Sequence, residues 1–288
     1  MKKKILISTG GSGGHVIPAA ILYDQLKNEF DTFLTIDNRG KNFLNLKNYK
    51  HTIINTPKLF SNIVFFPINL FLFAISFFKS LFFLKKNKIN ILISTGGYMS
   101  LPSCIASIML GIKIYLFEPN MVLGRSNSIF LKYCKKIFCY SKELINYPKK
   151  YTQKIVLISP LLRKEFYSLE PDNLDQINSE INLLIIGGSQ GAKLFDSELQ
   201  NLILKISKKY KLNIFQQATI SNFEKLKNFY VEKNISHKLF NFEENILQIT
   251  KKINLCITRA GASTLSELTF LNIPFLAIPL PSAKDNHQ

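Results

Sequence analysis

Four loops rich in glycine and other small residues are the features of this sequence best suited to chemistry. Each follows a short apolar run and opens a segment with helical spacing; the loops are residues 10–15, 94–98, 187–192 and 258–263. A turn of this kind at the start of a helix presents backbone N–H groups and the positive end of the helix dipole, which together bind phosphate. Two loops fall in each half of the chain, so the pattern predicts one or two ligands that carry a diphosphate. For Gly96 and Gly97, close packing of a strand against a helix is an equally good explanation.

Two side chains beside these loops could take part in a reaction. His15 directly follows the first loop, and an imidazole titrates near neutral pH and can act as a general base. Ligand binding or helix capping is its alternative role. Glu267 lies one helical turn beyond Ser263, where a carboxylate can accept both hydroxyls of a ribose. A solvated glutamate favoured by the helix dipole is the alternative.

Other site classes have weaker support. The chain lacks the GxxxxGK[ST] loop of ATPases, and residues 11–14 do not match the GxGxxG turn of dinucleotide-binding proteins. Asp37 nevertheless stands where a carboxylate could bind a ribose, so a nicotinamide oxidoreductase stays open. Four scattered histidines without an HExxH motif argue against a metal site.

The elements that must position these residues alternate between strands and helices. Short apolar runs predict parallel strands at 5–7, 91–93, 155–158, 183–186 and 255–257, and the spacing predicts helices over 18–30, 193–209 and 263–271. We therefore expect two doubly wound α/β domains, residues 1–165 and 166–288, joined by a polar linker at 167–180. Ligands of such sheets bind at the carboxyl ends of the strands, so the site would lie in the cleft between the facing domains.

Composition and charge narrow the class of protein. Of 288 residues, 47% are hydrophobic and 19% are charged, which excludes a disordered, collagenous or coiled-coil chain. A net charge of +18 fits an anionic membrane, a phosphorylated substrate or a nucleic acid as the partner, and drift toward Lys, Asn, Ile and Phe explains part of it. No nucleic-acid-binding motif occurs, so we expect no nucleic acid partner. Four cysteines without a CxxC pair, and no signal peptide, predict buried, reduced thiols in a cytosolic protein.

Only four basic residues are arginines: Arg39, Arg125, Arg163 and Arg259. Because lysine is so strongly favoured in this chain, we expect an arginine to mark a place that needs a planar, bidentate donor.

Residues 63–84 form a long apolar segment with eight phenylalanines, followed by Lys85, Lys86 and Lys88. Its length approaches that of a membrane span, but Pro67, Asn69, Ser76 and Lys79 interrupt it, and the chain must return to the same sheet afterwards. We expect a helix that packs one face on the sheet and presents Phe and Lys to an anionic membrane surface. A wholly buried helix is the alternative.

Six motifs together resemble a known family. They are GGSGGHVIPA at 10–19, STGGYMSLP at 94–102, FEPNMVLG at 117–124, GGSQGA at 187–192, TRAGASTLSE at 258–267 and PLPSAKDNHQ at 279–288. Their residues and order are similar to those of the MurG family, which transfers N-acetylglucosamine (GlcNAc) to lipid I to make lipid II in bacterial peptidoglycan synthesis. The resemblance implies a GT-B fold and a peripheral protein on the cytoplasmic face of the inner membrane. Residues 1–165 would meet the membrane and bind the lipid acceptor, and residues 166–288 would bind UDP-GlcNAc.

The resemblance also implies a set of site residues. Ser12, Gly13 and Gly14 would lie near the donor sugar or the acceptor diphosphate, and Asn120 would contact the donor sugar. The nucleotide diphosphate, ribose and sugar would be bound by Arg163, Ser189, Ala262, Ser263, Thr264, Leu265, Ser266, Glu267 and Gln288. The implied reaction is an inverting displacement, with no metal or other cofactor, in which the MurNAc 4-hydroxyl attacks C1 of GlcNAc. His15 is the candidate base.

Three departures from the family pattern bear on these expectations. Residues 159–163 read SPLLR where the family usually has Asn-Pro-Val-Arg, and Glu243 stands where an apolar residue often meets the uracil. The family normally continues beyond the position of Gln288, so we expect a second domain short of its last helices. The alternatives are a truncated, non-catalytic membrane protein that binds a lipid diphosphate, and another GT-B lipid glycosyltransferase.

Overall fold

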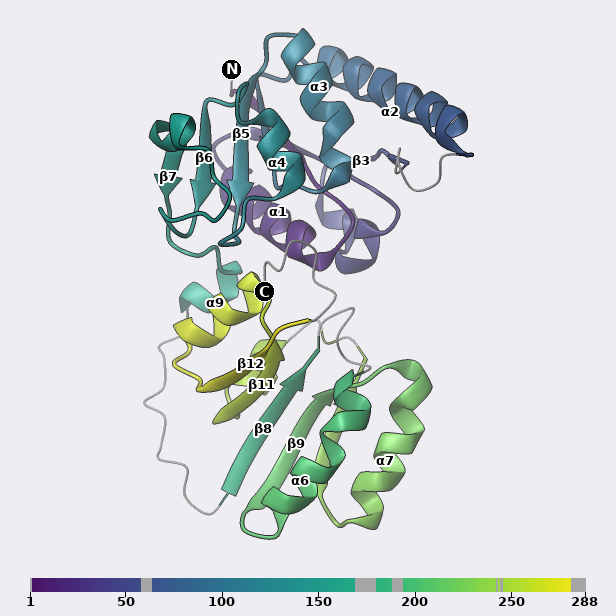
Figure 1. Cartoon of the computed structure of the whole chain (residues 1–288), viewed down its shortest axis with the longest axis vertical. Coiled ribbons are helices and arrows are strands. Elements are labelled where there is room, and N and C mark those ends of the chain that lie inside the picture. Colours follow the sequence, from purple (N-terminus) through teal and green to yellow (C-terminus); the bar gives the residue numbers. More distant parts are fainter. Residues whose placement is uncertain are drawn as a thin grey trace. The chain divides into compact units, whose positions relative to one another are not determined.

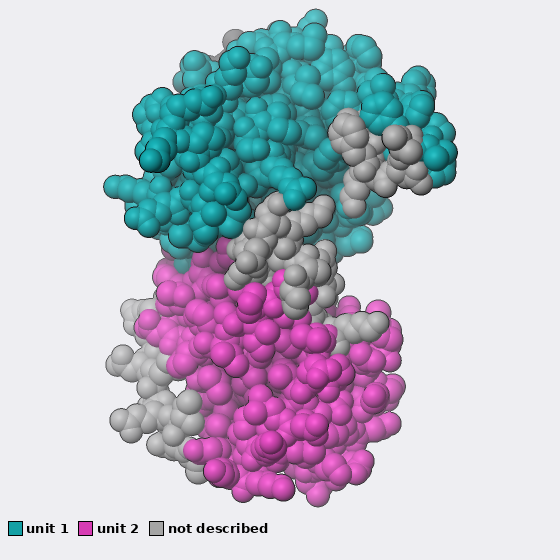
Figure 2. Space-filling model, in the orientation of Figure 1, with its two compact units in different colours: residues 1–164, 287 teal, residues 165–286, 288 magenta. Residues whose placement is uncertain are grey.

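The computed structural model describes residues 2–57, 64–168, 180–187, 194–241, 243 and 246–280. The chain forms two compact units, residues 1–164 (unit 1) and residues 165–286 (unit 2), which are coloured separately in Figure 2. Each unit has its own parallel sheet with helices beside it, as Figure 1 shows, and each is described by itself.

Unit 1 is built on a seven-stranded parallel sheet in the order β3-β2-β1-β4-β5-β6-β7. Its strands are β1 (Lys4–Ser8), β2 (Asp31–Ile36), β3 (His51–Ile53), β4 (Ile91–Ser94), β5 (Lys113–Glu118), β6 (Lys136–Cys139) and β7 (Ile155–Leu157). Its helices are α1 (Gly13–Leu26), α2 (Phe66–Asn87), α3 (Leu101–Met109) and α4 (Arg125–Phe130). From β1 the chain adds β2 and β3 on one side, returns to form β4 on the other side of β1, and continues through β5 and β6 to β7 at the opposite edge.

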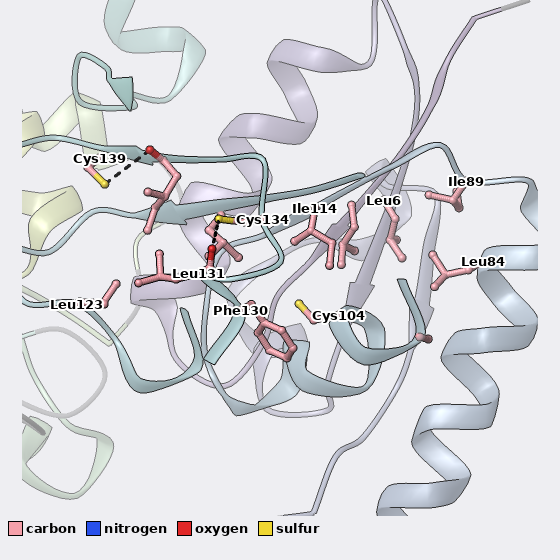
Figure 3. Close-up of a cluster of buried hydrophobic side chains, with 14 residues drawn as sticks. Leu6, Leu84, Ile89, Cys104, Ile114, Leu123, Phe130, Leu131, Cys134 and Cys139 are labelled. Carbon is pink, nitrogen blue, oxygen red and sulfur yellow. Dashed lines mark hydrogen bonds between the residues drawn. The ribbon is translucent and has the colours of Figure 1, made fainter. Parts of the chain in front are cut away.

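Both faces of this sheet are buried. Successive side chains of a strand point to opposite faces, and the side chains on each face lie in a core cluster. Leu6 of β1 packs with Leu84 of α2, Cys104 of α3 and Phe130 of α4, as Figure 3 shows. Ile5 and Ile7 lie in a second cluster, with Ala19 and Tyr23 of α1. Cys134 and Cys139 are also buried in the first cluster, and the four cysteines of the chain are unpaired thiols, as the sequence predicts.

Unit 2 has a five-stranded parallel sheet in the order β10-β9-β8-β11-β12. Its strands are β8 (Glu180–Ile186), β9 (Lys211–Gln217), β10 (Ser236–Phe240), β11 (Leu255–Arg259) and β12 (Phe275–Ile278), and its helices are α6 (Gln200–Ser207), α7 (Phe223–Glu232), α8 (Ile246–Thr250) and α9 (Ala262–Phe270). Leu183 and Ile185 pack into one core cluster with Phe195 and Tyr230. Leu184 packs on the opposite face, with Cys256 and Leu268.

The predicted strands are confirmed, and the helix boundaries need correction. The helix expected over 18–30 begins at Gly13 and ends at Leu26, so the glycine loop itself supplies the first turn. Pro18 lies inside it near the N-terminus, where its missing N–H removes one helical hydrogen bond. The segment expected to be helical over 193–209 is interrupted at Leu199. Most of the proposed linker, residues 169–179, lies outside the described residues.

Candidate functional site

In unit 1 the first two glycine loops lie side by side. β1 pairs with β4, so the loops that follow them leave the same edge of the sheet, at the point where the strand order reverses. The hydroxyl of Thr95 donates to the hydroxyl of Thr9 over 2.8 Å, and both side chains are buried. Such a reversal point is where doubly wound sheets bind their ligands.

The loop at 10–15 presents N–H groups at the start of α1. Ser12 is the N-cap residue, but its side chain makes no capping hydrogen bond. Within the described part of the chain, the N–H groups of Gly13 and Gly14 have no acceptor. First-turn N–H groups of a helix that remain open in this way favour an anionic ligand.

His15 is held in one tautomer. Its Nδ1 lies 2.8 Å from the carbonyl oxygen of Thr95, and because a carbonyl only accepts, Nδ1 carries the proton. In the neutral ring the lone pair is therefore on Nε2. A Cβ on Gly97 would lie 3.2 Å from the His15 ring and one on Gly96 would lie 3.4 Å from it, and both glycines have positive φ (85° and 77° for Gly96 and Gly97). These glycines thus let the histidine ring pack on the second loop.

Asp37 has a different role from the ribose contact considered above. Its side chain is buried, and Oδ1 accepts hydrogen bonds from the N–H groups of Gly11 and Gly40, each over 2.8 Å. Oδ2 accepts from Nε of Arg39 over 3.0 Å. The carboxylate is therefore used inside unit 1 to hold the first glycine loop.

Glu118 supports the loop of a candidate site residue, and the sequence reasoning did not single it out. It is buried at the end of β5, where Oε1 accepts from Nδ2 of Asn120 (3.0 Å) and from its N–H (3.3 Å). Oε2 accepts from the N–H of Gly124 (2.8 Å) and from Nδ2 of Asn127 (3.0 Å). Glu118 thus folds the 118–127 loop and fixes the side chain of Asn120, a candidate donor-sugar contact.

Arg163 belongs to the last segment of unit 1. This segment is anchored where Ile158 donates its N–H to Cys139 O (3.0 Å) and Leu161 donates its N–H to the hydroxyl of Tyr140 (2.8 Å). Leu161 and Leu162 are buried, and Arg163 is half-buried. The two leucines that stand where the family usually has one valine therefore have a packing role.

In unit 2 the other two loops also follow neighbouring central strands, because β8 pairs with β11 where the strand order reverses. α9 begins directly after Gly261, and no side chain caps its N-terminus. The candidate residues in this stretch, Ala262, Ser263, Thr264, Leu265, Ser266 and Glu267, are all half-buried. The Ser266 hydroxyl donates to the Ala262 carbonyl over 2.8 Å, so it is bonded within the helix. Ser189 and Gln288 lie outside the described residues.

Arg259 lies in the loop at 258–263 and is one of the four arginines that the sequence singles out, although the sequence assigns it no role. The side chain is buried; Nη1 donates to the carbonyls of Ile278 (3.2 Å) and Pro279 (2.9 Å), and the guanidinium stacks 4.7 Å from the ring centre of Phe195. Burial lowers the pKa of this guanidinium. Arg259 therefore ties the end of β11 to the end of β12.

Helix α2 has an unusual distribution of side chains. Its buried residues are Ser76, Ser80 and Leu84, one turn apart, and the Ser80 hydroxyl lies 3.4 Å from that of Ser103 on α3. The small serines let α2 approach α3 closely. The opposite face exposes large apolar side chains: Ile68, Phe71, Ile75, Phe78 and Phe82. Among the described residues, α2 is the one helix long and apolar enough to cross a membrane.

In the described residues, no group of three His, Cys, Asp or Glu side chains gathers closely enough to hold a metal ion. Glu243, near the expected uracil position, forms an ion pair with Lys238, with Nζ and Oε2 3.4 Å apart.

Comparisons with known proteins identify the family. Residues 5–139 match the glycosyltransferase family 28 N-terminal domain, and residues 182–288 match the family's C-terminal domain. The UDP-N-acetylglucosamine–N-acetylmuramyl-(pentapeptide) pyrophosphoryl-undecaprenol N-acetylglucosamine transferase of Pelagibacter ubique is 54% identical over 288 residues, which cover 100% of this chain and 80% of that protein. The transferase of the same name from Rickettsia canadensis is 36% identical, covering 99% of this chain and 81% of the relative.

Solved structures agree on the fold. The crystal structure of Acinetobacter baumannii MurG matches with a TM-score of 0.72 at 24% identity, over 100% of this chain and 81% of that one. A UDP-GlcNAc 2-epimerase from Neisseria meningitidis, bound to UDP-GlcNAc, matches with a TM-score of 0.64 at 14% identity, over 95% of this chain and 82% of that one. With two parallel-sheet α/β units, the fold is of the GT-B type, as the sequence resemblance implies. The chain therefore belongs to glycosyltransferase family 28 and, within it, to the MurG family of N-acetylglucosamine transferases.

Proposed function

We propose that this protein transfers GlcNAc from UDP-GlcNAc to the 4-hydroxyl of MurNAc in undecaprenyl-pyrophosphoryl-MurNAc-pentapeptide, converting lipid I to lipid II. The observation that carries this proposal is the 54% identity over the whole chain with the Pelagibacter transferase. The paired loops of each unit suit an enzyme whose two substrates both carry a diphosphate. An oxidoreductase loses its support, because Asp37 is bonded to Gly11, Gly40 and Arg39.

Unit 1 supplies the acceptor side of the reaction. The open N–H groups of Gly13 and Gly14, beside Ser12, bind the diphosphate of the lipid. Nε2 of His15 accepts the proton of the 4-hydroxyl as its oxygen attacks C1 of GlcNAc, since the Thr95 carbonyl keeps the other ring nitrogen protonated. Asn120, held by Glu118, contacts the donor sugar.

Unit 2 supplies the donor side. The bond from C1 to the UDP oxygen breaks as the new bond forms, and negative charge develops on the leaving diphosphate. The N-terminus of α9 and Ser189 stabilise that charge, while Glu267 binds the ribose and Gln288 the sugar. The family pattern assigns Arg163, in the last segment of unit 1, to the same diphosphate. Inversion at C1 follows from attack on the face opposite UDP.

The charge of the chain supports membrane attachment through unit 1. Residues 1–164 hold 24 Lys and Arg against 6 Asp and Glu, whereas residues 165–288 hold 13 of each, so unit 1 carries the whole net charge of +18. Compositional drift would affect both halves alike and does not explain this difference. We infer that the exposed face of α2 enters the interface of an anionic membrane, with the exposed Lys79, Lys85 and Lys86 facing the lipid phosphates. The protein is then peripheral, on the cytoplasmic face of the inner membrane.

A transfer assay tests the reaction. Purified protein is incubated with radiolabelled UDP-GlcNAc and a short-chain analogue of lipid I, and the lipid-linked disaccharide is measured. Product is expected, and its absence from a folded protein that binds UDP would favour the non-catalytic alternative.

The role of His15 is tested in the same assay. His15→Ala should lower kcat by about 100-fold or more if the imidazole is the base. His51→Ala is the matched control, because His51 also has Nδ1 bonded to a backbone carbonyl, that of Tyr49, but lies exposed on β3. An unchanged kcat in His15→Ala would refute the role.

Vesicle binding tests the membrane surface. The side chains of Phe71 and Phe78 are each more than 60% exposed. Phe71→Glu and Phe78→Glu should each reduce binding to phosphatidylglycerol vesicles by at least about 10-fold. Binding of the unaltered chain should weaken as salt is added, because surface charges are screened. Ile220→Glu is the control, since Ile220 is an apolar residue of unit 2 that is 80% exposed. An equal loss in the control would count against α2 as the contact.

A further inference from the structure

Arg39 is anchored beside the first glycine loop. Its Nε donates to Oδ2 of Asp37 over 3.0 Å, while Oδ1 of the same carboxylate accepts the N–H of Gly11 over 2.8 Å. Its Nη2 lies 3.3 Å from Sδ of Met99 and 3.7 Å from the position that a Cβ on Gly11 would occupy. One buried carboxylate thus fixes the loop and the guanidinium relative to each other.

The outer edge of this guanidinium faces solvent. The Arg39 side chain is 56% exposed although its Nε is bonded to a carboxylate that is 3% exposed. Among the described residues, Nη1 of Arg39 has no hydrogen-bond partner. An arginine placed in this way can bond a carboxylate through Nε and still offer N–H groups to a second anion.

A lysine would do both tasks less well, because its ammonium lacks the planar fork that holds one N–H on the Asp37 carboxylate and directs others toward a second anion. The chain uses lysine at 33 of its 37 basic positions, so an arginine at position 39 indicates a need for the planar guanidinium. A purely structural purpose is weakly supported: beyond Asp37, the guanidinium has the Met99 sulfur as its partner, and sulfur is a poor acceptor.

We propose that Arg39 is a substrate-binding residue that contacts the diphosphate of the lipid acceptor, alongside the N–H groups of Gly13 and Gly14. This inference rests on the proposed function, which assigns that diphosphate to the first glycine loop. Asp37 is then a positioning residue for both the loop and the arginine. Together they distinguish a lipid diphosphate from a lipid monophosphate, because the second phosphate gives the guanidinium an additional charged partner.

The experiment compares Arg39→Ala and Arg39→Lys with the unaltered chain. KM is measured separately for the lipid I analogue and for UDP-GlcNAc, and the binding of farnesyl diphosphate and farnesyl monophosphate to the protein is measured by calorimetry. Lys47→Ala is the control, because it removes one positive charge from an exposed residue of unit 1. Thermal unfolding of each variant establishes that it is folded, and Arg39→Lys alone decides the question if Arg39→Ala does not fold.

Both Arg39 variants should raise KM for the lipid I analogue by about 10-fold. This value is at the lower end of what a hydrogen bond between charged groups contributes, because the Arg39 side chain is half exposed. KM for UDP-GlcNAc should not change, and farnesyl diphosphate should lose more affinity than farnesyl monophosphate. Equal effects on both substrates, no effect on either, or equal losses for the two farnesyl phosphates would overturn the proposal. If the unaltered chain transfers no GlcNAc, the proposed function fails, and the binding of farnesyl diphosphate still decides the role of Arg39.

Discussion

Replacing Glu118 with glutamine should loosen the loop that holds Asn120, and the structure allows the cost to be worked out. Each carboxylate oxygen accepts one backbone N–H, from Asn120 or Gly124, and one side-chain amide. In Glu118→Gln, an NH2 group replaces one of the two carboxylate oxygens and faces the backbone N–H and the side-chain amide that this oxygen accepted from. An asparagine amide can rotate away, and Oδ1 of Asn127, which has no partner among the described residues, could then accept from the new NH2 group. A backbone N–H cannot rotate, so one of them loses its acceptor at a cost of about 1–3 kcal/mol.

Differential scanning calorimetry measures this cost. A loss of about 2 kcal/mol should lower the Tm of the transition of unit 1 by about 4–8 °C. Glu118→Ala should lower it further, because both acceptors disappear. Glu143→Gln is the control, since Glu143 is exposed in the same unit and should shift Tm by no more than about 1–2 °C. In the transfer assay, KM for UDP-GlcNAc should rise in Glu118→Gln. A Tm and a KM indistinguishable from those of the unaltered chain would show that Glu118 does not hold the loop.

Three further predictions concern the second glycine loop and the buried thiols. Gly97→Ala should destabilise the protein by about 1–3 kcal/mol and lower kcat, because the residue has a φ of 77° and the new Cβ would press on the His15 ring; a fully active, equally stable variant would contradict the described contact. Burial raises the pKa of three thiols to about 12, those of Cys104, Cys139 and Cys256, so a disulfide reagent at pH 8 should modify them after denaturation and not before. The same pKa shift means that the folded state retains these protons while unfolded thiols lose theirs above about pH 9. The free energy of unfolding should therefore fall as the pH rises from 9 toward 12. A urea midpoint that stays constant across that range would refute this prediction.

The parts of the site that follow from local pattern could be predicted from the sequence. An apolar run that ends in a glycine turn and a helix is a local signal, and it located the loops that follow β1, β4, β8 and β11. That these strands form two adjacent central pairs is a consequence of the doubly wound topology. The outward apolar face of α2 was also predicted, but the residues that face inward were not, because a helix apolar on all sides gives no periodic signal; the serines mark the inner face.

The roles of buried polar residues could not be predicted in this way. Asp37 looked like a ribose contact because it follows a strand, and only the fold brings the N–H groups of Gly11 and Gly40 to it. Glu118 depends on the loop returning so that Gly124 lies against its carboxylate. The Nδ1 proton of His15 is fixed by the carbonyl of Thr95, which is 80 residues away in the sequence. Contacts of this kind are long-range and leave no spacing to recognise.

The packing of α2 on α3 has a consequence for the order in which the chain is made. α2 ends at Asn87, and its partner α3 is complete only at Met109. At ordinary rates of translation, the interval between the completion of α2 and that of α3 lasts about 1–4 s. During this interval neither face of the phenylalanine-rich helix α2 is packed against a partner. A nascent chain with such a segment is prone to aggregate. Under the membrane attachment proposed above, synthesis at a membrane surface would cover the exposed apolar face of α2 with lipid before α3 covers the other face.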